Sequence, residues 1–414
     1  MKQGWKKTYL KDACKVFTDG NWIESKDQSN EGIRLVQTGN IGFGFFKDKE
    51  DKSRFISEET FHRLKCTEIL PGDLLVSRLP DPVGKSCIIP EINSKMITGV
   101  DCTIIRPKDN VSSEFLCYYQ MSDEYLNDVQ LGVSGATRQR ISRKNLGQIE
   151  IPLPPLLEQQ RIVAILDEAF AAIAKAKANA EQNLKNAKEL FESYLQGVFE
   201  NKGEGWVVKK LIEITNKIGS GATPRGGNES YKTEGISLVR SMNVHDFEFR
   251  EKNLAFIDDQ QAKELNNVTL QENDVLLNIT GASVARCCVI PIDYLPARVN
   301  QHVSIIRANK EIIDPIFLNL LLTSKFYKDQ LLFTGEQGAT RQAITKAQLE
   351  VFEVSFPKNI KEQKSLMNKL DAISAETKKL ESIYQQKIND LEELKKSVLQ
   401  KAFSGELKTN AVTV

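Results

Sequence analysis

The stretch LLEQQRIVAILDEAF at Leu156–Phe170 returns in altered form as IKEQKSLMNKLDAIS at Ile360–Ser374. Each copy opens a long run without proline, from Glu158 to Phe199 and from Glu362 to Phe403. Apolar residues recur through both runs at steps of three or four, a spacing typical of a coiled-coil seam. We therefore predict two helices of about 40 residues, each about 60 Å long.

The rest of the chain is duplicated in the same order. GWKKTYLKDAC from Gly4 matches GWVVKKLIEIT from Gly205, and GIRLVQTGNI from Gly32 matches GISLVRSMNV from Gly235. The pentapeptide GATRQ occurs at 135–139 and again at 338–342. The offset is roughly 200 residues, far above the roughly 20–50 of solenoid repeats. We interpret the chain as a tandem duplication of a globular head followed by a long helix.

Composition excludes several classes of protein. The chain has 414 residues, of which 41% are apolar and 27% charged, as in a packed globular protein. The net charge of +1 means that nucleic-acid binding must come from local basic patches. The seven cysteines form no C-x-x-C pair, and we expect reduced thiols that fill cores. No apolar run approaches the ~20 residues of a membrane span, so we expect a cytoplasmic protein.

Each head is predicted to be α+β. Short β-branched runs such as DLLVS, KSCIIP and CTIIRP are bounded by Gly, Pro and Asp, which is typical of strands. SEFLCYYQMSDEYLNDVQ and DPIFLNLLLTSKFYKDQLL have helical spacing and are expected to be capped by Ser113 and Asp314. The predicted domains are head 1 at 1–155, a long helix at 156–201, head 2 at 202–357, a second long helix at 358–407 and a tail at 408–414.

The long helices are expected to pair with each other, since a lone amphipathic helix is unstable in water. If the heads sit at opposite ends of the pair, the helices must run antiparallel. The alternative is that each helix packs on the core of its own head. The predicted pairing residues are Leu166, Ile173, Ala180, Leu184 and Leu190 in the first helix, and Leu370, Leu380, Ile388, Leu394 and Val398 in the second.

Several motifs together make the chain similar to the specificity subunits of type I restriction–modification systems. They are IPLPPLLEQQRIVAILD at the first helix, SFPKNIKEQKSLMNKLD at the second and LKKSVLQKAFSGEL near the end. The resemblance implies two target recognition domains that each read one half of a bipartite DNA sequence, with the helices setting the gap. It also implies docking of two modification (methyltransferase) subunits and, through the complex, of restriction (motor–nuclease) subunits.

The sequence indicates no catalytic centre of its own, and no cofactor or metal is expected on this chain. The resemblance assigns S-adenosylmethionine, and ATP with Mg²⁺, to the partner subunits. VGKS at 83–86 lacks the first glycine of a phosphate-binding loop. His62, His245 and His302 show no ligand spacing. Asp73 and Asp274 are interpreted as turn residues before a strand.

Cations and amides in turns are the candidates for contacts with double-stranded DNA, because Arg recognises guanine or phosphate and Gln or Asn recognises adenine. GATRQ is the same in both heads, so we interpret it as a shared frame that positions the backbone, or packs the head, rather than reading bases. Base readers should lie where the heads differ. The candidate readers are Asn40, Arg78, Arg225, Arg240, Asn243, Asn278 and Arg286. Lys85 and Arg286 are possible phosphate contacts, and the further DNA-contact candidates in and beside the GATRQ segments are Arg138, Gln139, Arg140, Arg341 and Gln342.

Three alternatives stay open at this point. The first is an interaction scaffold whose paired heads bind protein or glycan. The second is an enzyme hidden in the heads, which alanine substitutions of Asp73 and Asp274 would test. The third is a specificity module of another methylation-based defence system.

Overall fold

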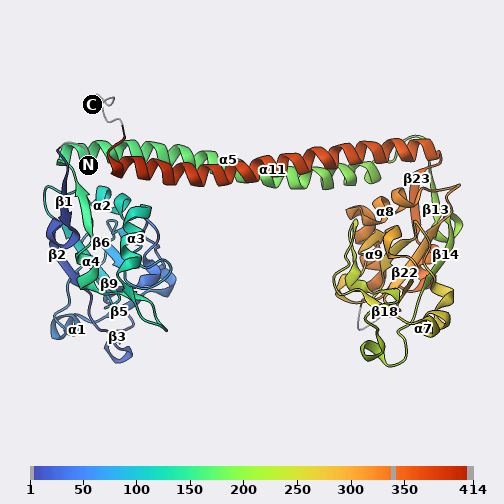
Figure 1. The fold of residues 1–414 in the computed structure, drawn as a ribbon, viewed down its shortest axis with the longest axis horizontal. Helices are drawn as coiled ribbons and strands as arrows, with labels where there is room; N and C mark the ends of the chain where they lie inside the picture. Colours follow the sequence, from blue (N-terminus) through green and yellow to red (C-terminus); the bar gives the residue numbers. More distant parts are fainter. Residues whose placement is uncertain (1–3, 337–341, 408–414) are drawn as a thin grey trace. The chain divides into compact units, whose positions relative to one another are not determined.

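The computed structural model describes residues 4–336 and 342–407 of the chain. Contacts divide the protein into two compact units (Figure 1). Unit 1 is assigned residues 1–181 and 386–414, and unit 2 is assigned residues 182–385. Each unit therefore combines one head with the first part of one long helix and the last part of the other.

Head 1 contains an antiparallel four-stranded sheet in the order β2–β9–β6–β7. A second sheet has the order β3–β5–β4–β8, in which β4 and β8 are parallel. Strand β1 pairs with β12, which joins the two ends of the head. The bounds are β1 Lys6–Tyr9, β2 Cys14–Asp19, β3 Gln28–Ser29, β4 Ile33–Val36, β5 Arg54–Ile56, β6 Leu74–Ser77, β7 Ser86–Ile88, β8 Met96–Thr98, β9 Cys102–Pro107, β10 Val133–Ser134, β11 Arg140–Ile141 and β12 Glu150–Leu153.

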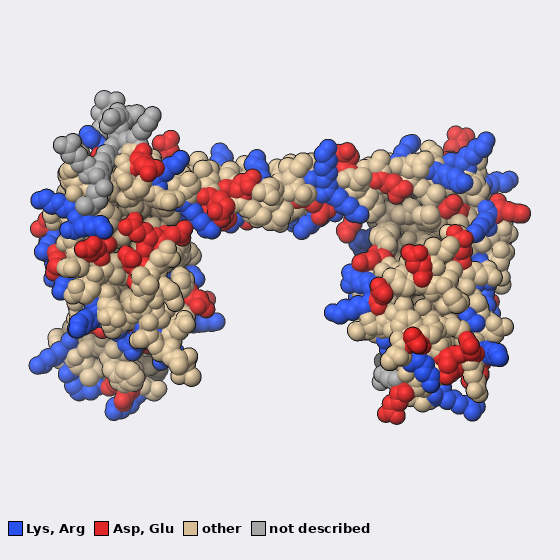
Figure 2. Space-filling model, viewed as in Figure 1, with Lys and Arg blue, Asp and Glu red and all other residues tan. Residues whose placement is uncertain are grey.

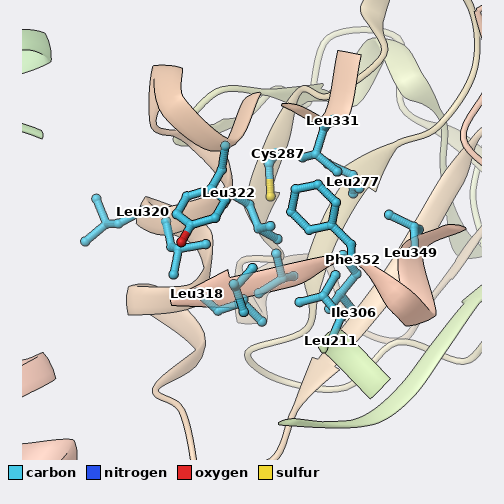
Figure 3. Packing of buried hydrophobic residues seen from close by; sticks show 14 of the residues in the cluster. Leu211, Leu277, Cys287, Ile306, Leu318, Leu320, Leu322, Leu331, Leu349 and Phe352 are labelled. Atoms are coloured by element: carbon cyan, nitrogen blue, oxygen red, sulfur yellow. The ribbon is translucent and has the colours of Figure 1, made fainter. Parts of the chain in front are cut away.

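Head 2 repeats this plan. Its sheets have the orders β14–β22–β19–β20 and β18–β15–β21, and β13 pairs with β23 as β1 pairs with β12. The main core packs β19 and β22 against helices α8 and α9, with Leu277, Ile306, Leu318 and Leu331 inside (Figure 3). The bounds are β13 Trp206–Lys210, β14 Thr215–Ser220, β15 Ile236–Val239, β16 Val244–His245, β17 Glu248–Phe249, β18 Ala255–Ile257, β19 Val275–Asn278, β20 Cys287–Val289, β21 Ala297–Val299, β22 Val303–Ala308 and β23 Glu353–Pro357.

The helices of the heads refine the sequence prediction. Each predicted helix is two helices, because Ser122 caps the second helix of head 1 and Ser324 interrupts the corresponding run of head 2. The cap of the first helix in head 1 is Ser112 rather than Ser113, while Asp314 caps as expected. The bounds are α1 Glu58–Arg63, α2 Ser113–Tyr119, α3 Asp123–Leu131, α4 Arg143–Gly147, α6 Leu211–Ile214, α7 Asp259–Glu264, α8 Pro315–Thr323, α9 Lys325–Glu336 and α10 Lys346–Val351.

The long helices are α5, Leu156–Glu200, and α11, Ile360–Ser404, each of 45 residues. In unit 1 they run antiparallel: Lys177 pairs with Glu392, and Lys395 lies 4.8 Å from the ring centre of Phe170. The predicted antiparallel pairing is therefore confirmed, and the alternative that each helix packs on its own head is partly right as well. The start of α5 packs on head 1, where Leu166 is buried.

The end of each long helix enters a core. In unit 1 the α11 residue Phe403 packs edge-on against Phe115 and Tyr119, with ring centres 5.4 and 5.2 Å away. In unit 2 the α5 residue Phe199 packs in the same way against Phe317, at 5.6 Å. Each unit thus contains the last turns of a helix that begins in the other repeat.

A buried glutamine attaches the start of each long helix to the head before it. Gln159 accepts a hydrogen bond from Ser112 N at 2.8 Å and donates to the carbonyl oxygens of Asn110 and Pro154 at 3.1 and 2.8 Å. Gln363 makes the same three bonds in unit 2. Both side chains are fully buried, so these bonds fix the angle at which the helix leaves its head.

The predicted seam is right in part. Leu166, Ala180 and Leu370 are buried, and most of the other predicted residues are half-buried, namely Ile173, Leu184, Leu380, Ile388 and Val398. Leu190 and Leu394 were predicted wrongly, because they are 50% and 48% exposed. The final turns bury residues at four-residue steps instead, Leu195 and Phe199 in α5 and Leu399 and Phe403 in α11, since those turns face a head core.

Asp73 and Asp274 are turn residues, as expected, and also members of buried ion pairs. Asp73 accepts from Leu70 N and from two nitrogens of Arg106, all at 2.8 Å. Asp274 accepts from Arg307 in the same bidentate way, at 2.7 Å. These pairs fix the turn before β6 and β19.

All seven cysteines are unpaired and buried, as the sequence indicates. Burial raises the pKa of the Cys14, Cys87 and Cys102 thiols to about 12, so these thiols are neutral near pH 7. Among the residues that the structure describes, none of the helices has the length and apolar character needed to cross a bilayer.

We predict that Phe403→Ala destabilises unit 1 by about 3–5 kcal/mol, because it leaves a cavity among aromatic rings. Leu394→Ala, nine residues earlier on the same helix, removes a side chain that is 48% exposed and should change stability by about 0.5 kcal/mol or less. Guanidinium unfolding of the full chain measures both. Equal losses for the two variants would contradict the assignment of Phe403 to the core.

Candidate nucleic-acid interface

In each head, a glycine lets two loops cross at the end of a sheet. Gly20, after β2, donates to the Cys102 carbonyl oxygen at 3.0 Å, and Gly221, after β14, donates to the Asn300 carbonyl oxygen at 3.1 Å. A Cβ at Gly20 would lie 2.1 Å from the Thr98 carbonyl oxygen, and one at Gly221 would lie 1.8 Å from that of Val299. A residue without a side chain is therefore required at both crossings.

The crossing in head 1 gathers polar side chains into a surface that we call edge 1. It comprises residues 20–23, 37–40 and 99–101, which surround a hollow of about 200 Å³, together with residues 138–140, which contact Asp101. Asp101 pairs with Arg138 at 3.0 Å and with Arg140 at 3.3 Å, which ties the first GATRQ segment to this edge. Trp22 is 70% exposed beside it.

The crossing in head 2 builds edge 2, which comprises residues 221–225, 240–243, 280–286, 300–302 and 342. Its hollow of about 450 Å³ is lined by Ser241, Thr280, Arg286 and His302, among others. The backbone N–H of Gly281 donates to the Gln342 carbonyl oxygen at 3.1 Å, so the end of the second GATRQ segment also lies here.

The two edges share their framework and differ in their side chains. The short helix Thr38–Asn40 of edge 1 corresponds to Ser241–Asn243 of edge 2, and each follows a parallel-paired strand. At matching places, however, edge 1 has Trp22, Gln37 and Asp101, whereas edge 2 has Thr223, Arg240 and His302. One fold therefore presents different hydrogen-bonding groups at equivalent positions.

Several of the residues predicted from sequence lie on these edges or beside them. Arg138, Gln139, Arg225 and Gln342 are exposed, and Arg140, Arg240 and Arg286 are half-buried. Lys85 is half-buried and donates to the Asp81 carbonyl oxygen at 2.9 Å, and burial lowers its pKa. Arg341 lies outside the described residues.

Three of the predicted asparagines use their side-chain amides to hydrogen-bond backbone groups of nearby loops. Asn40 accepts from Gln37 N at 3.0 Å and donates to the Lys47 carbonyl oxygen at 3.1 Å. Asn243, fully buried, makes the equivalent bonds in head 2, and the buried Asn278 donates to the Ser241 carbonyl oxygen at 2.9 Å. The expectation that Asn243 and Asn278 are open to DNA disagrees with this burial.

Arg78 is likewise an internal residue. Its side chain is 5% exposed, and it pairs with Asp19 at 3.1 Å and donates to the backbone carbonyls of Val100 and Ile141. It joins three segments under edge 1, and its counterpart in head 2 is the buried Ile279. Burial lowers the pKa of Arg78, and the Asp19 carboxylate acts against that shift. The prediction that Arg78 contacts bases conflicts with this placement.

Sequence reasoning missed the loop between the parallel-paired strand and the CTIIRP or VSIIRA strand. It reads TGVDC at 98–102 and VNQHV at 299–303, and it supplies Asp101, Gln301 and His302. His302 was set aside as a scattered histidine, although both ring nitrogens are hydrogen-bonded. The position of this loop could have indicated its role, because its sequence differs between the two heads directly before a strand whose sequence is similar in both.

Charge is distributed in small patches. Figure 2 shows Lys and Arg interspersed with Asp and Glu on the visible face of each unit. Within the described part of the chain, no group of three or more His, Cys, Asp or Glu side chains is arranged to hold a metal ion.

Comparison with known proteins assigns this architecture to a family. Residues 2–185 and 203–393 each match the family described as Type I restriction modification DNA specificity domain. The two matches follow the internal duplication and cover most of the chain. The chain therefore belongs to this family and is a type I restriction–modification specificity subunit.

Individual relatives agree in length and fold. A putative type I restriction enzyme MjaX specificity subunit of Methanocaldococcus jannaschii is 23% identical, covering 98% of this chain and 94% of the relative. The EcoBI specificity subunit of Escherichia coli is 24% identical, covering 96% and 85%. The crystal structure of the HsdS subunit from Thermoanaerobacter tengcongensis, 19% identical, matches with a TM-score of 0.68 over 98% of both chains. A chain from a type I R–M system structure, 20% identical, matches with a TM-score of 0.72 over 98% of this chain and 99% of that one.

We predict that Asp101→Asn strengthens duplex binding by roughly 3- to 10-fold at low salt, because Arg138 and Arg140 lose the carboxylate that neutralises them. Asp109→Asn makes the same charge change at the opposite end of β9, where Asp109 is 91% exposed, and is the matched control. Fluorescence anisotropy with a labelled duplex measures both. Equal gains would show that net charge, rather than edge 1, is responsible.

Proposed function

We propose that this specificity subunit binds duplex DNA through edges 1 and 2, and that each edge reads one half of a bipartite, asymmetric target. The observation that carries the proposal is the pair of equivalent crossings with different polar side chains. A common scaffold with exchanged side chains suits two half-sites of different sequence, because base edges are distinguished by their donor and acceptor patterns.

In both heads, the GATRQ segments are proposed to contact the DNA backbone and not the bases. Arg138 lies beside Asp101 in edge 1, and the Gln342 carbonyl is bonded to Gly281 in edge 2. The identity of this pentapeptide in the two heads suits contacts with the phosphate backbone, which is the same at every sequence. These segments would set the register of each head on the duplex.

The long helices are proposed to set the gap between the half-sites and to dock two methyltransferase subunits. Leu190 and Leu394 occupy equivalent positions of the two repeats and are about half exposed in both. Tyr194 is also 37% exposed on the last turns of α5. Apolar side chains that are repeated and left open on a helix are suited to a partner surface.

Catalysis is proposed to belong entirely to the partners. The methyltransferase subunits would use S-adenosylmethionine for adenine methylation, and the restriction subunits would use ATP with Mg²⁺ for cleavage. This chain would bind none of these molecules and would direct the complex to its site. We place the complex in the cytoplasm, where its DNA target lies and where the thiols stay reduced.

A salt-titrated binding assay with the purified chain tests the proposal. We expect the affinity for duplex DNA to fall steeply as salt rises, with a slope of about −0.9 for each phosphate contact, because bound cations displace counterions. Alanine at both Arg138 and Arg140 should make this slope shallower by about one to two contacts.

The rival function is a scaffold whose heads bind protein or glycan. It has some support from Leu131 and Phe333, which are 87% and 63% exposed at equivalent positions of α3 and α9. The scaffold predicts no salt-dependent affinity for duplex DNA. An affinity below detection at low salt, for a chain with intact far-UV circular dichroism, would favour the scaffold.

A further inference from the structure

Edge 2 contains a continuous chain of side-chain hydrogen bonds. Thr223 contacts the carbonyl oxygen of the Gln301 amide, and the nitrogen of that amide lies 3.1 Å from Nε2 of His302. Nδ1 of His302 contacts the hydroxyl of Thr280. Four residues from three separate segments are thereby held in one arrangement before any ligand binds.

These bonds constrain the Gln301 amide in the same way in either of its two orientations. If the amide donates to His302, its carbonyl oxygen accepts from the Thr223 hydroxyl. If the amide is turned over, its nitrogen donates to Thr223 and its oxygen accepts from His302. In both cases one lone pair of the carbonyl oxygen is engaged and one N–H of the amide is left over.

Edge 2 also presents hydrogen-bond donors that this chain of bonds does not use. Gln301 is an exposed residue, so a ligand can approach its side chain. Arg286 lines the same hollow as Thr280 and His302, and within the described ranges no acceptor contacts its guanidinium. An edge that offers donors fits a base that offers acceptors.

We propose that Gln301 is a base-reading residue of head 2 and that it selects guanine. This inference rests on the proposed function, DNA binding through edge 2. Guanine presents two acceptors, N7 and O6, in the major groove, whereas the bidentate pairing of a glutamine with adenine needs both the amide oxygen and the amide nitrogen. One of the two lone pairs of the Gln301 oxygen is engaged by its neighbour, and the donors of Arg286 in the same hollow favour a base that presents acceptors. Arg286 supplies a second donor from the same hollow.

Head 1 cannot read a base in this way. The residues equivalent to Thr223, Gln301 and His302 are Trp22, Val100 and Asp101. Edge 1 therefore has no amide at this place, and its carboxylate is paired with two arginines. A change at Gln301 should alter one half of the target and leave the other half as it was.

The test is selection of bound duplexes from a randomised library by the purified full chain, followed by sequencing. Gln301→Glu keeps the shape of the side chain and replaces the donor by an acceptor. We expect the preference for guanine at one position of one half-site to fall roughly 10- to 100-fold, with a shift toward cytosine, which offers a donor there. Gln271→Glu, at the opposite end of β19 from Thr280, makes the same charge change and should leave the motif unchanged.

Thr223→Val provides a second variant that removes one hydroxyl with little change in volume. It frees the Gln301 amide to rotate and should weaken the guanine preference at the same position by several-fold. A motif unaltered by both variants, or altered equally by Gln271→Glu, overturns the assignment of Gln301 while the DNA-binding function stands. A wild-type chain that enriches no motif overturns the proposed function itself.

Discussion

The insertion of Phe199 and Phe403 into aromatic cores is the interaction on which the architecture depends. Each ring ends a long helix that began in the other repeat, so neither unit has a complete core without the other half of the chain. Burial of such a ring contributes about 1.5–3 kcal/mol, and the loss of packing on its removal adds to this. The buried Gln159 and Gln363 fix where each helix starts, and the two phenylalanines fix where it ends.

The heads divide their residues between a common framework and a variable surface. The glycine crossings, the buried Asp–Arg pairs and the loop-framing Asn40 and Asn243 recur in both copies with nearly the same bonds. At the crossing itself, head 1 has Val100 and Asp101 where head 2 has Gln301 and His302. Side chains can change there at little cost to stability, because they are exposed or half-buried and the framework lies beneath them.

The parts of the fold with a strong period could be predicted from the sequence. The long helices, the strands around DLLVS and CTIIRP, and the antiparallel pairing follow from apolar spacing and from the repeat. The errors have local causes. Leu190 and Leu394 fit the three- or four-residue spacing of the predicted seam. The last turns of the helices face the head cores, however, and bury Leu195 and Leu399 instead. Arg78 is internal because Asp19 and two carbonyl groups meet it, and spacing contains no information about such partners. His302 gains its place from a loop crossing that no sequence period marks.

The central claim is that two heads on one chain read the two parts of a split DNA sequence. Genome-wide mapping of adenine methylation, in the source cell with and without this chain, tests that claim most directly. One methylated motif, with two short specific parts around a fixed gap, should be lost with the chain. Exchange of residues 1–155 for another head should change one part alone. Methylated motifs that stay the same while the methyltransferase subunit is present would contradict this claim.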